Sequence, residues 1–308
     1  MEEKSFSENK PTTFVTKVDI SIAETMIADL QAQDFSITKP QYTLFSAKKK
    51  GLSCTLYQSG KLMVQGKGTP EFLEFYLEPQ ILGSFGYTYA ELEIDKTARI
   101  GIDEAGKGDF FGPLCIAGVF AEGEDILRLK GLGVRDSKSI SDPNILTIGK
   151  KIRKQYAHHV IKLNPFKYNE LYNNFRNLNH LLAWGHAAAI GTLVEKTGCK
   201  NALIDQFAAK HVVETALKKR NLKIDLTQRH RGEEDLVVAA ASILAREAFL
   251  EGLDELSREY GLKLPKGASA VVIRAGKSFI RKYGQDAFSY VAKLHFKTAN
   301  IVISNHQG

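Results

Sequence analysis

Two adjacent carboxylates, Asp103 and Glu104, directly follow a short apolar run at residues 100–102. Glycines at positions 106, 108 and 112 come immediately afterwards, in the sequence Gly-Ile-Asp-Glu-Ala-Gly-Lys-Gly-Asp-Phe-Phe-Gly-Pro. An apolar run that gives way to glycine indicates a strand ending in a tight turn. Two acids at such an end, beside backbone that a ligand can approach closely, could hold a divalent metal ion against a phosphate.

Two simpler interpretations compete with a metal site. Residues 101–107 fit the first seven positions of a nucleotide-binding P-loop, but Gly108 stands where Ser or Thr would bind magnesium. Asp103 and Glu104 would also repel the phosphates, so the P-loop is disfavoured. An acidic surface turn is the other alternative. The metal interpretation therefore needs more carboxylates elsewhere in the chain.

Further carboxylates occur at two places downstream. Asp205 ends the apolar run 201–204, as Asp103 ends the first run. Glu233, Glu234 and Asp235 then precede an Ala-rich segment, 236–246, which predicts a helix packed closely against a sheet. Acids before a helix also suit its dipole, so ordinary N-terminal capping is the alternative for any one of them.

These blocks together resemble the type 2 ribonucleases H, the family that holds ribonucleases HII and HIII. The resemblance covers about residues 97–250. It is carried by the following segments: Asp-Glu-Ala-Gly-Lys-Gly-Asp-Phe-Phe-Gly-Pro at 103–113, Arg-Asp-Ser-Lys at 135–138, Asn-Leu-Asn-His-Leu-Leu-Ala-Trp-Gly-His at 177–186, Leu-Ile-Asp-Gln-Phe at 203–207, and Ala-Ala-Ala-Ser-Ile-Leu-Ala-Arg at 239–246.

Three features are closer to ribonucleases HIII than to HII. They are a glutamate as fourth site acid, the Asn-Leu-Asn…Trp-Gly-His block, and nearly a hundred residues before the first catalytic strand. Two features depart from that group. The glycine loop reads Gly-Lys-Gly, which is closer to HII, and the stretch between Asp205 and the Ala-rich helix is short. The fourth acid is therefore Glu233 or, as the alternative, Glu234.

The resemblance implies the activity and the residues that carry it. It predicts an endonuclease that hydrolyses the RNA strand of RNA–DNA hybrids, leaving 5′-phosphate and 3′-hydroxyl ends. Two divalent ions roughly 4 Å apart would activate water and stabilise the leaving oxygen, and oxygen-only ligands favour Mg²⁺ or Mn²⁺. The predicted catalytic and metal-binding residues are Asp103, Glu104, Asp205 and Glu233. The predicted substrate-binding residues are Gly106, Lys107, Gly108, Lys138, Asn177, Asn179 and Ser242.

Several of these assignments have alternatives. Side chains alternate along a strand, so we expect Glu104 to sit where the strand breaks into the glycine loop. Asp136 could contact substrate or only orient Lys138, and Asn177 and Asn179 could simply form a turn. For the whole chain the rivals are a ribonuclease HII-like preference for single ribonucleotides in DNA, a metal-dependent DNA nuclease, and a non-catalytic nucleic-acid-binding protein.

The elements around these residues predict two domains. Residues 95–308 should form an α/β ribonuclease H-like domain, a central mixed sheet flanked by helices. Residues 86–94 should be a linker. Residues 1–85 predict a small α+β domain, and its segment 56–67 resembles one repeat of the TATA-binding protein; in ribonucleases HIII such a domain binds substrate. Its predicted elements are strands at 14–19, 41–46, 52–57 and 61–65, with helices at 21–33 and from 69.

Charge supports nucleic-acid binding at two places. Residues 1–90 carry nine lysines and ten acids and are not basic overall, but Lys48, Lys49, Lys50, Lys61 and Lys67 cluster in the strand region. A solvated hairpin is the alternative interpretation of this cluster. Residues 257–308 carry nine Lys or Arg and two acids, a net charge of +7 that equals the formal charge of the chain. Within them, 276–282 and 293–297 place cations and apolar residues at helical spacing, as in a helix lying on phosphates.

Composition sets the remaining bounds. A chain of 308 residues with 44% hydrophobic residues can bury a core in each of two domains. Three cysteines in apolar contexts, without CxxC spacing, predict buried thiols in a reducing compartment. No apolar stretch is long enough for a membrane span and the N-terminus lacks a signal peptide's apolar core. We therefore expect a cytoplasmic monomer without a membrane partner or an implied protein partner.

Overall fold

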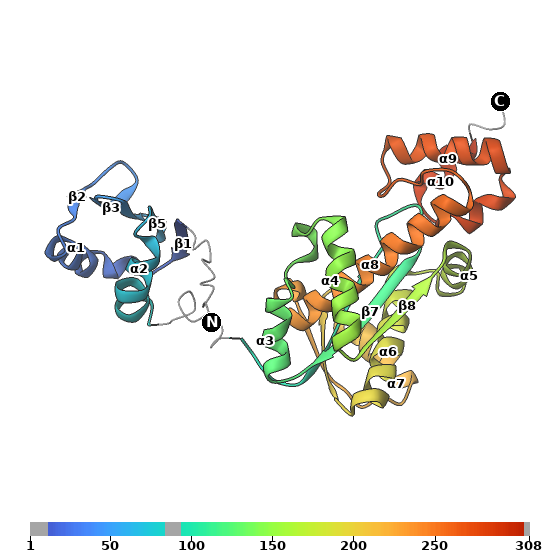
Figure 1. Ribbon diagram of the computed structural model, residues 1–308, viewed down its shortest axis with the longest axis horizontal. Helices are drawn as coiled ribbons and strands as arrows, with labels where there is room; N and C mark the ends of the chain where they lie inside the picture. Colours follow the sequence, from blue (N-terminus) through green and yellow to red (C-terminus); the bar gives the residue numbers. More distant parts are fainter. Residues whose placement is uncertain (1–11, 84–93, 305–308) are drawn as a thin grey trace, which may run out of the picture. The chain divides into compact units, whose positions relative to one another are not determined.

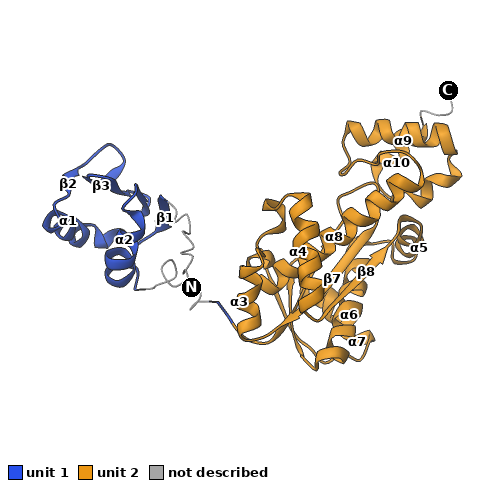
Figure 2. Cartoon of the chain, viewed as in Figure 1, with its two compact units in different colours: residues 1–95 blue, residues 96–308 orange. Residues whose placement is uncertain are grey.

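The computed structural model describes residues 12–83 and 94–304. The chain divides into two compact units, residues 1–95 and 96–308, which Figure 2 colours separately. The predicted linker, residues 86–94, lies outside the described residues except for its last position. No helix in the described parts is long and apolar enough to cross a membrane.

The first unit is a five-stranded antiparallel sheet with its helices on one face. Its strands lie in the order β1-β5-β4-β3-β2. Their bounds are β1 Thr13–Lys17, β2 Ser36–Thr38, β3 Thr43–Lys49, β4 Leu52–Tyr57 and β5 Lys61–Gln65. The helices are the 3-10 turn η1 Ile20–Ile22, α1 Ala23–Ala32, α2 Thr69–Phe72 and the π-helical η2 Leu73–Leu82. The predicted α+β class is confirmed, whereas β2, three residues long, was not anticipated.

Alternation along the strands decides which face of this sheet is covered. In β4, Leu52, Cys54 and Leu56 are buried, and they pack with Met26 and Leu30 of α1. The residues between them point to the other face and are partly exposed. This open face is crossed by one register row whose members are Val15, Met63, Thr55, Ser46 and Thr38.

The second unit is built on a five-stranded mixed sheet, which confirms the predicted fold class. Its strands are β6 Arg99–Ala105, β7 Leu114–Ala121, β8 His158–Leu163, β9 Asn201–Asp205 and β10 Asp225–Arg229. They lie in the order β10-β9-β6-β7-β8, with β10, β9 and β6 parallel and β7 antiparallel to both β6 and β8. The acid-bearing ends of β6 and β9 therefore lie next to each other at one edge of the sheet.

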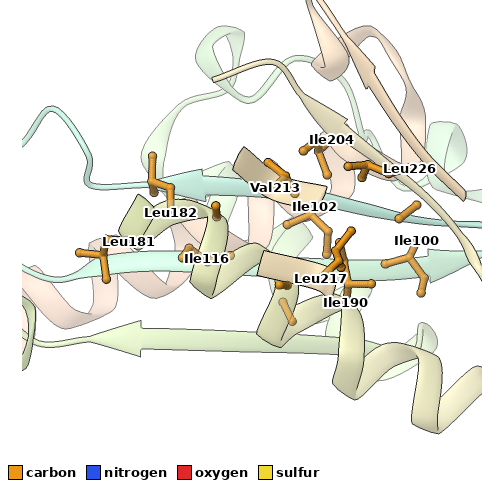
Figure 3. Close-up of a cluster of buried hydrophobic side chains, with 14 of the residues drawn as sticks. Ile100, Ile102, Ile116, Leu181, Leu182, Ile190, Ile204, Val213, Leu217 and Leu226 are labelled. Atoms are coloured by element: carbon orange, nitrogen blue, oxygen red, sulfur yellow. The ribbon is translucent and has the colours of Figure 1, made fainter. Parts of the chain in front are cut away.

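Helices cover both faces of the second sheet (Figure 1). The helices are α3 Glu124–Gly131, α4 Asp142–Gln155, α5 Pro165–Phe175, α6 Leu178–Thr197, α7 Lys210–Lys219, α8 Leu236–Glu259, α9 Ala270–Tyr283 and α10 Lys297–Ser304, with 3-10 turns η3 Ser137–Ser139, η4 Gly232–Glu234 and η5 Asp286–Tyr290. Ile100 and Ile102 face α6 and α7 in the cluster drawn in Figure 3. Gly101 faces α8, where a Cβ would meet the Val237 carbonyl carbon at 2.5 Å. The Ala-rich helix thus packs directly on β6, as expected.

The C-terminal elements corrected one prediction. Residues 293–296 form a turn rather than part of a helix, and α10 begins only at Lys297. Lys293 is fully buried, and its Nζ donates to the carbonyl oxygens of Asp109 at 2.9 Å and Gly112 at 2.6 Å. The prediction that Lys293 presents its charge to phosphate is therefore wrong: the side chain braces the glycine-rich loop from within the protein.

The cysteines depart from the prediction at one position. All three are free thiols, and Cys54 and Cys115 are buried, which raises the pKa of each to about 12. Cys199, however, is only partly buried, because it lies in the loop between α6 and β9 rather than inside an element.

Candidate active site

Asp103 and Glu104 both lie within β6, on opposite faces of the sheet. The strand stays paired with β7 as far as Ala105, opposite Cys115, so the expectation that the strand breaks at Glu104 is wrong. Glu104 faces α6, where its Oε2 lies 3.0 Å from Nε2 of His186. Asp103 faces α8 and hydrogen-bonds the Ser242 side chain. Both side chains nevertheless line the same cavity.

Asp205 stands at the end of the neighbouring strand β9. Its Oδ1 accepts a hydrogen bond of 2.9 Å from the backbone N–H of Gly232. A Cβ on Gly232 would lie 2.8 Å from the Cα of Asp205, so only glycine lets the 3-10 turn η4 approach this closely. The contact with Asp205 therefore explains why a glycine, Gly232, precedes Glu233.

The three acids that precede α8 occupy three different environments. Glu233 points to Lys138, with Oε1 and Nζ 3.2 Å apart. Glu234 is exposed and pairs with Arg231 at 3.5 Å. Asp235 is the N-cap of α8, accepting from the backbone N–H groups of residues 237 and 238, and it also pairs with Arg99 at 2.7 Å. The capping interpretation thus holds for Asp235 and not for Glu233.

One cavity of about 390 Å³ gathers most of the predicted site residues. We call it the acidic cavity. Those predicted residues that line it are Asp103, Glu104, Asp205, Glu233, Gly106, Lys107, Gly108, Lys138 and Ser242. Asn177 and Asn179 do not line it. Asn177 instead caps α6 by accepting the backbone N–H of Asn179 at 2.8 Å, which is the turn-forming alternative.

The carboxylates of the acidic cavity have unequal proton affinities. Burial, and then the charge of Glu104, raise the pKa of Asp103 to about 7. Burial would also raise the pKa of Glu104, but the hydrogen bonds and charges of His186 and Lys107 outweigh it and hold that pKa below its usual value. A backbone hydrogen bond and the Lys138 ammonium lower the pKa of Glu233. The cavity therefore favours added positive charge near Asp103.

Two lysines supply part of that charge. Nζ of Lys107 lies 3.1 Å from Glu104, and Lys138 pairs with Glu233. Among the described residues, no three His, Cys, Asp or Glu side chains converge closely enough to hold a metal ion. The chemistry of the donors still fits a hard divalent cation, because four carboxylates from three segments line one cavity and the two lysines that pair with them are exposed to solvent. A bound cation would take the place of these ammonium groups.

Sequence reasoning missed several residues at this site. His186 lies within the Trp-Gly-His block, but that block gave no reason to pair it with Glu104. Arg246 and Lys266 also line the cavity, and both pair with Asp142. Arg246 is the last residue of the segment 239–246 that carried the resemblance, whereas nothing in the sequence around Lys266 distinguishes it from other loop lysines. Asp136 accepts a hydrogen bond from the backbone N–H of Lys138 at 2.9 Å, so it orients that residue.

Comparisons with known proteins agree with this geometry. The profile of the ribonuclease HII family matches residues 100–299, and a domain of unknown function (DUF3378) matches residues 13–83. The ribonuclease HIII of Protochlamydia amoebophila is 54% identical over 290 residues, which cover 94% of this chain and 96% of that protein. The ribonuclease HIII of Chlamydia felis is 50% identical, covering 94% and 97%. The crystal structure of Bst-RNase HIII in complex with Mn²⁺ superposes with a TM-score of 0.68 at 28% identity, covering 95% and 98%.

The second unit is a mixed sheet whose carboxylates lie at the ends of two adjacent parallel strands, and the family profile matches most of this unit. These features define an endoribonuclease of the ribonuclease H class, whose members depend on divalent metal ions. Within that class the relatives cover both units rather than the catalytic unit alone. The chain belongs to the ribonuclease HIII family.

Proposed function

We propose that this enzyme hydrolyses the RNA strand of RNA–DNA hybrids by two-metal-ion catalysis, leaving 5′-phosphate and 3′-hydroxyl ends. The observation that carries the proposal is the gathering of Asp103, Glu104, Asp205 and Glu233 around one cavity. These four residues would hold Mg²⁺ or Mn²⁺. When bound, the cations would supply an activated water and stabilisation of the leaving oxygen.

The other residues of the acidic cavity would position the substrate. Lys107 and Lys138 would leave their carboxylates for the phosphates next to the scissile bond, since an ammonium is a mobile point charge. His186 would keep Glu104 in place through the 3.0 Å hydrogen bond. Gly106 and Gly108 have no side chain to keep a ribose away, so the backbone of the loop could reach the 2′-hydroxyl that distinguishes RNA from DNA.

The first unit would bind the hybrid through the open face of its sheet. Lys17 and Lys61 are register partners on that face, and Lys48 lies on it beside Ser53. Hydroxyl side chains such as Thr55 and Ser46, which are 3.0 Å apart, lie between these lysines. Cations and hydroxyl groups on a sheet suit phosphate and sugar contacts without base readout. We propose domain limits of 1–85, 86–94 and 95–308, with the first domain as the substrate clamp.

Cleavage of labelled substrates tests the proposal. A continuous RNA–DNA hybrid, a DNA duplex with a single ribonucleotide, and an all-DNA duplex are compared with Mg²⁺ and with Mn²⁺. Cleavage of the hybrid alone, with 5′-phosphate and 3′-hydroxyl products, supports the proposal. Efficient cleavage of the single-ribonucleotide duplex indicates ribonuclease HII-like specificity, and cleavage of all-DNA duplex indicates a DNA nuclease.

Two variants test the roles proposed for the acidic cavity and for the first domain. Asp103→Asn should reduce cleavage at least about 10³-fold while hybrid binding persists, because the lysines remain. Binding without turnover by the unaltered enzyme would refute catalysis altogether. Deleting residues 1–85 should raise KM far more than it lowers kcat, and an unchanged KM would remove the first domain from substrate binding.

A further inference from the structure

A second cavity lies between α6 and α7, with a volume of about 420 Å³. None of the residues that line it also lines the acidic cavity. Two aromatic rings form part of its wall: Phe175 and Trp184 have ring centroids 6.2 Å apart, at an interplanar angle of 46°. Its volume falls within the range of small-molecule sites. The cavity is therefore large enough for a ligand and already has two aromatic rings in its wall.

The charge around this cavity is of one sign. Its basic side chains are His180, His211, Lys219 and Arg220, and no Asp or Glu is among the described residues that line it. Within the described parts of the chain these four side chains form no ion pair. The Arg220 guanidinium lies over the Trp184 ring at 6.0 Å, a cation–π contact that leaves its N–H groups available.

Helix α7 does contain a lysine that forms an ion pair with an acid of the same helix. Lys210, at the start of α7, pairs with Glu214 one turn later at 3.7 Å. Lys219 and Arg220, at the other end of α7, have no acid one turn before them, since positions 215 and 216 are Thr and Ala. Clustered cations without acid partners raise the local positive potential, which favours an anionic ligand.

We propose that this cavity binds a nucleotide: the base stacks on Trp184 in place of the Arg220 guanidinium, which moves off the ring and holds the phosphate together with Lys219. Stacking of a base on an aromatic side chain contributes roughly 1–3 kcal/mol, and guanidinium groups bind phosphate through paired N–H groups. The ligand is either a free nucleotide or an unpaired nucleotide of a nucleic-acid strand, because both present a base beside a phosphate. The proposal does not depend on the nuclease activity.

Fluorescence can test this directly, because Trp184 is the only tryptophan of the chain. The full-length enzyme is titrated, without divalent metal, with AMP, adenosine, inorganic phosphate and the single-stranded oligonucleotide (dA)6. We expect saturable quenching by AMP or by (dA)6. Adenosine and phosphate should each bind at least about tenfold more weakly than AMP, since each offers only half of the ligand.

Two double variants separate the site from general charge. Lys219→Ala with Arg220→Ala should weaken binding at least about tenfold. Lys218→Ala with Lys223→Ala removes the same charge from exposed positions outside the cavity and should change affinity less than about threefold. Asp103→Asn should leave the titration unchanged, which distinguishes this site from the acidic cavity.

The outcomes are distinct. If AMP binds as tightly as (dA)6 does per nucleotide, a free nucleotide is a sufficient ligand. If only (dA)6 quenches Trp184, the ligand is an unpaired nucleotide of a strand. The proposal is overturned if neither ligand quenches Trp184, or if both double variants lose affinity equally.

Discussion

Replacing Lys293 with methionine gives the sharpest test of the structure. The lysine is fully buried, its Nζ donates to two carbonyl oxygens of the glycine-rich loop, and it lies 5.6 Å from the Tyr168 ring. Methionine has a similar length but no donor. Each of the two carbonyls left without its partner should cost about 1–3 kcal/mol, so Lys293→Met should destabilise the second unit by about 2–6 kcal/mol at pH 9.

The loss should depend on pH in a defined direction. Burial lowers the pKa of Lys293 from 10.5 to about 7 in the folded protein. Between pH 7 and pH 10.5 the unfolded chain therefore binds more protons than the folded one, and the stability that this lysine supplies rises with pH. At about 1.4 kcal/mol per pH unit for each proton, the gap between wild type and Lys293→Met should widen by about 2 kcal/mol between pH 7 and pH 9.

Urea unfolding followed by Trp184 fluorescence measures this gap, because the tryptophan lies in the second unit. Lys297→Met is the matched control: it makes the same chemical change at an exposed position four residues later. Its stability should follow that of the wild type across the pH range. If the difference in stability between wild type and Lys293→Met stays constant from pH 7 to pH 9, or narrows, the assignment of Lys293 as a buried lysine with a lowered pKa is refuted.

Three further variants test individual contacts. Gly232→Ala should lower kcat at least about tenfold, because its Cβ would press against the backbone of the acid that ends β9; Gly131→Ala, where a Cβ meets nothing within 4 Å, is the control and should retain full activity. Asp235→Ala should destabilise the second unit by about 3–5 kcal/mol in urea unfolding, since it removes one partner of a buried ion pair with Arg99 and the N-cap of α8; Glu234→Ala, on the surface, should change stability by less than about 0.5 kcal/mol. Asp103→Asn should raise Tm at pH 8 without metal, because the raised pKa of Asp103 means that stability falls as pH rises from about 4 to 7; an equal or lower Tm would contradict that shift.

The sequence predicted the acids at the strand ends better than the side chains that pack around them. Asp103 and Asp205 each end an apolar run, as the pattern predicted, and the parallel pairing of β6 with β9, which the pattern does not give, brings those two ends together. His186 could not be assigned to Glu104 because that contact depends on how α6 lies across the sheet. Lys293 was misread because nine cations in one segment suggested a surface, and sequence does not show which of them turns inward.

The position of Glu104 explains why the site needed a structure. Alternation along a strand sends Asp103 towards α8 and Glu104 towards α6, so local geometry separates the two acids instead of joining them. The site forms because both helices meet β6 near its end: Ser242 comes from one and His186 from the other. A sequence motif can therefore identify both acids, but their different proton affinities depend on two helices, α6 and α8, that are separated by residues 198–235 in the chain. In this enzyme the packing of α6 and α8 against β6 therefore shapes the site as much as the motif does.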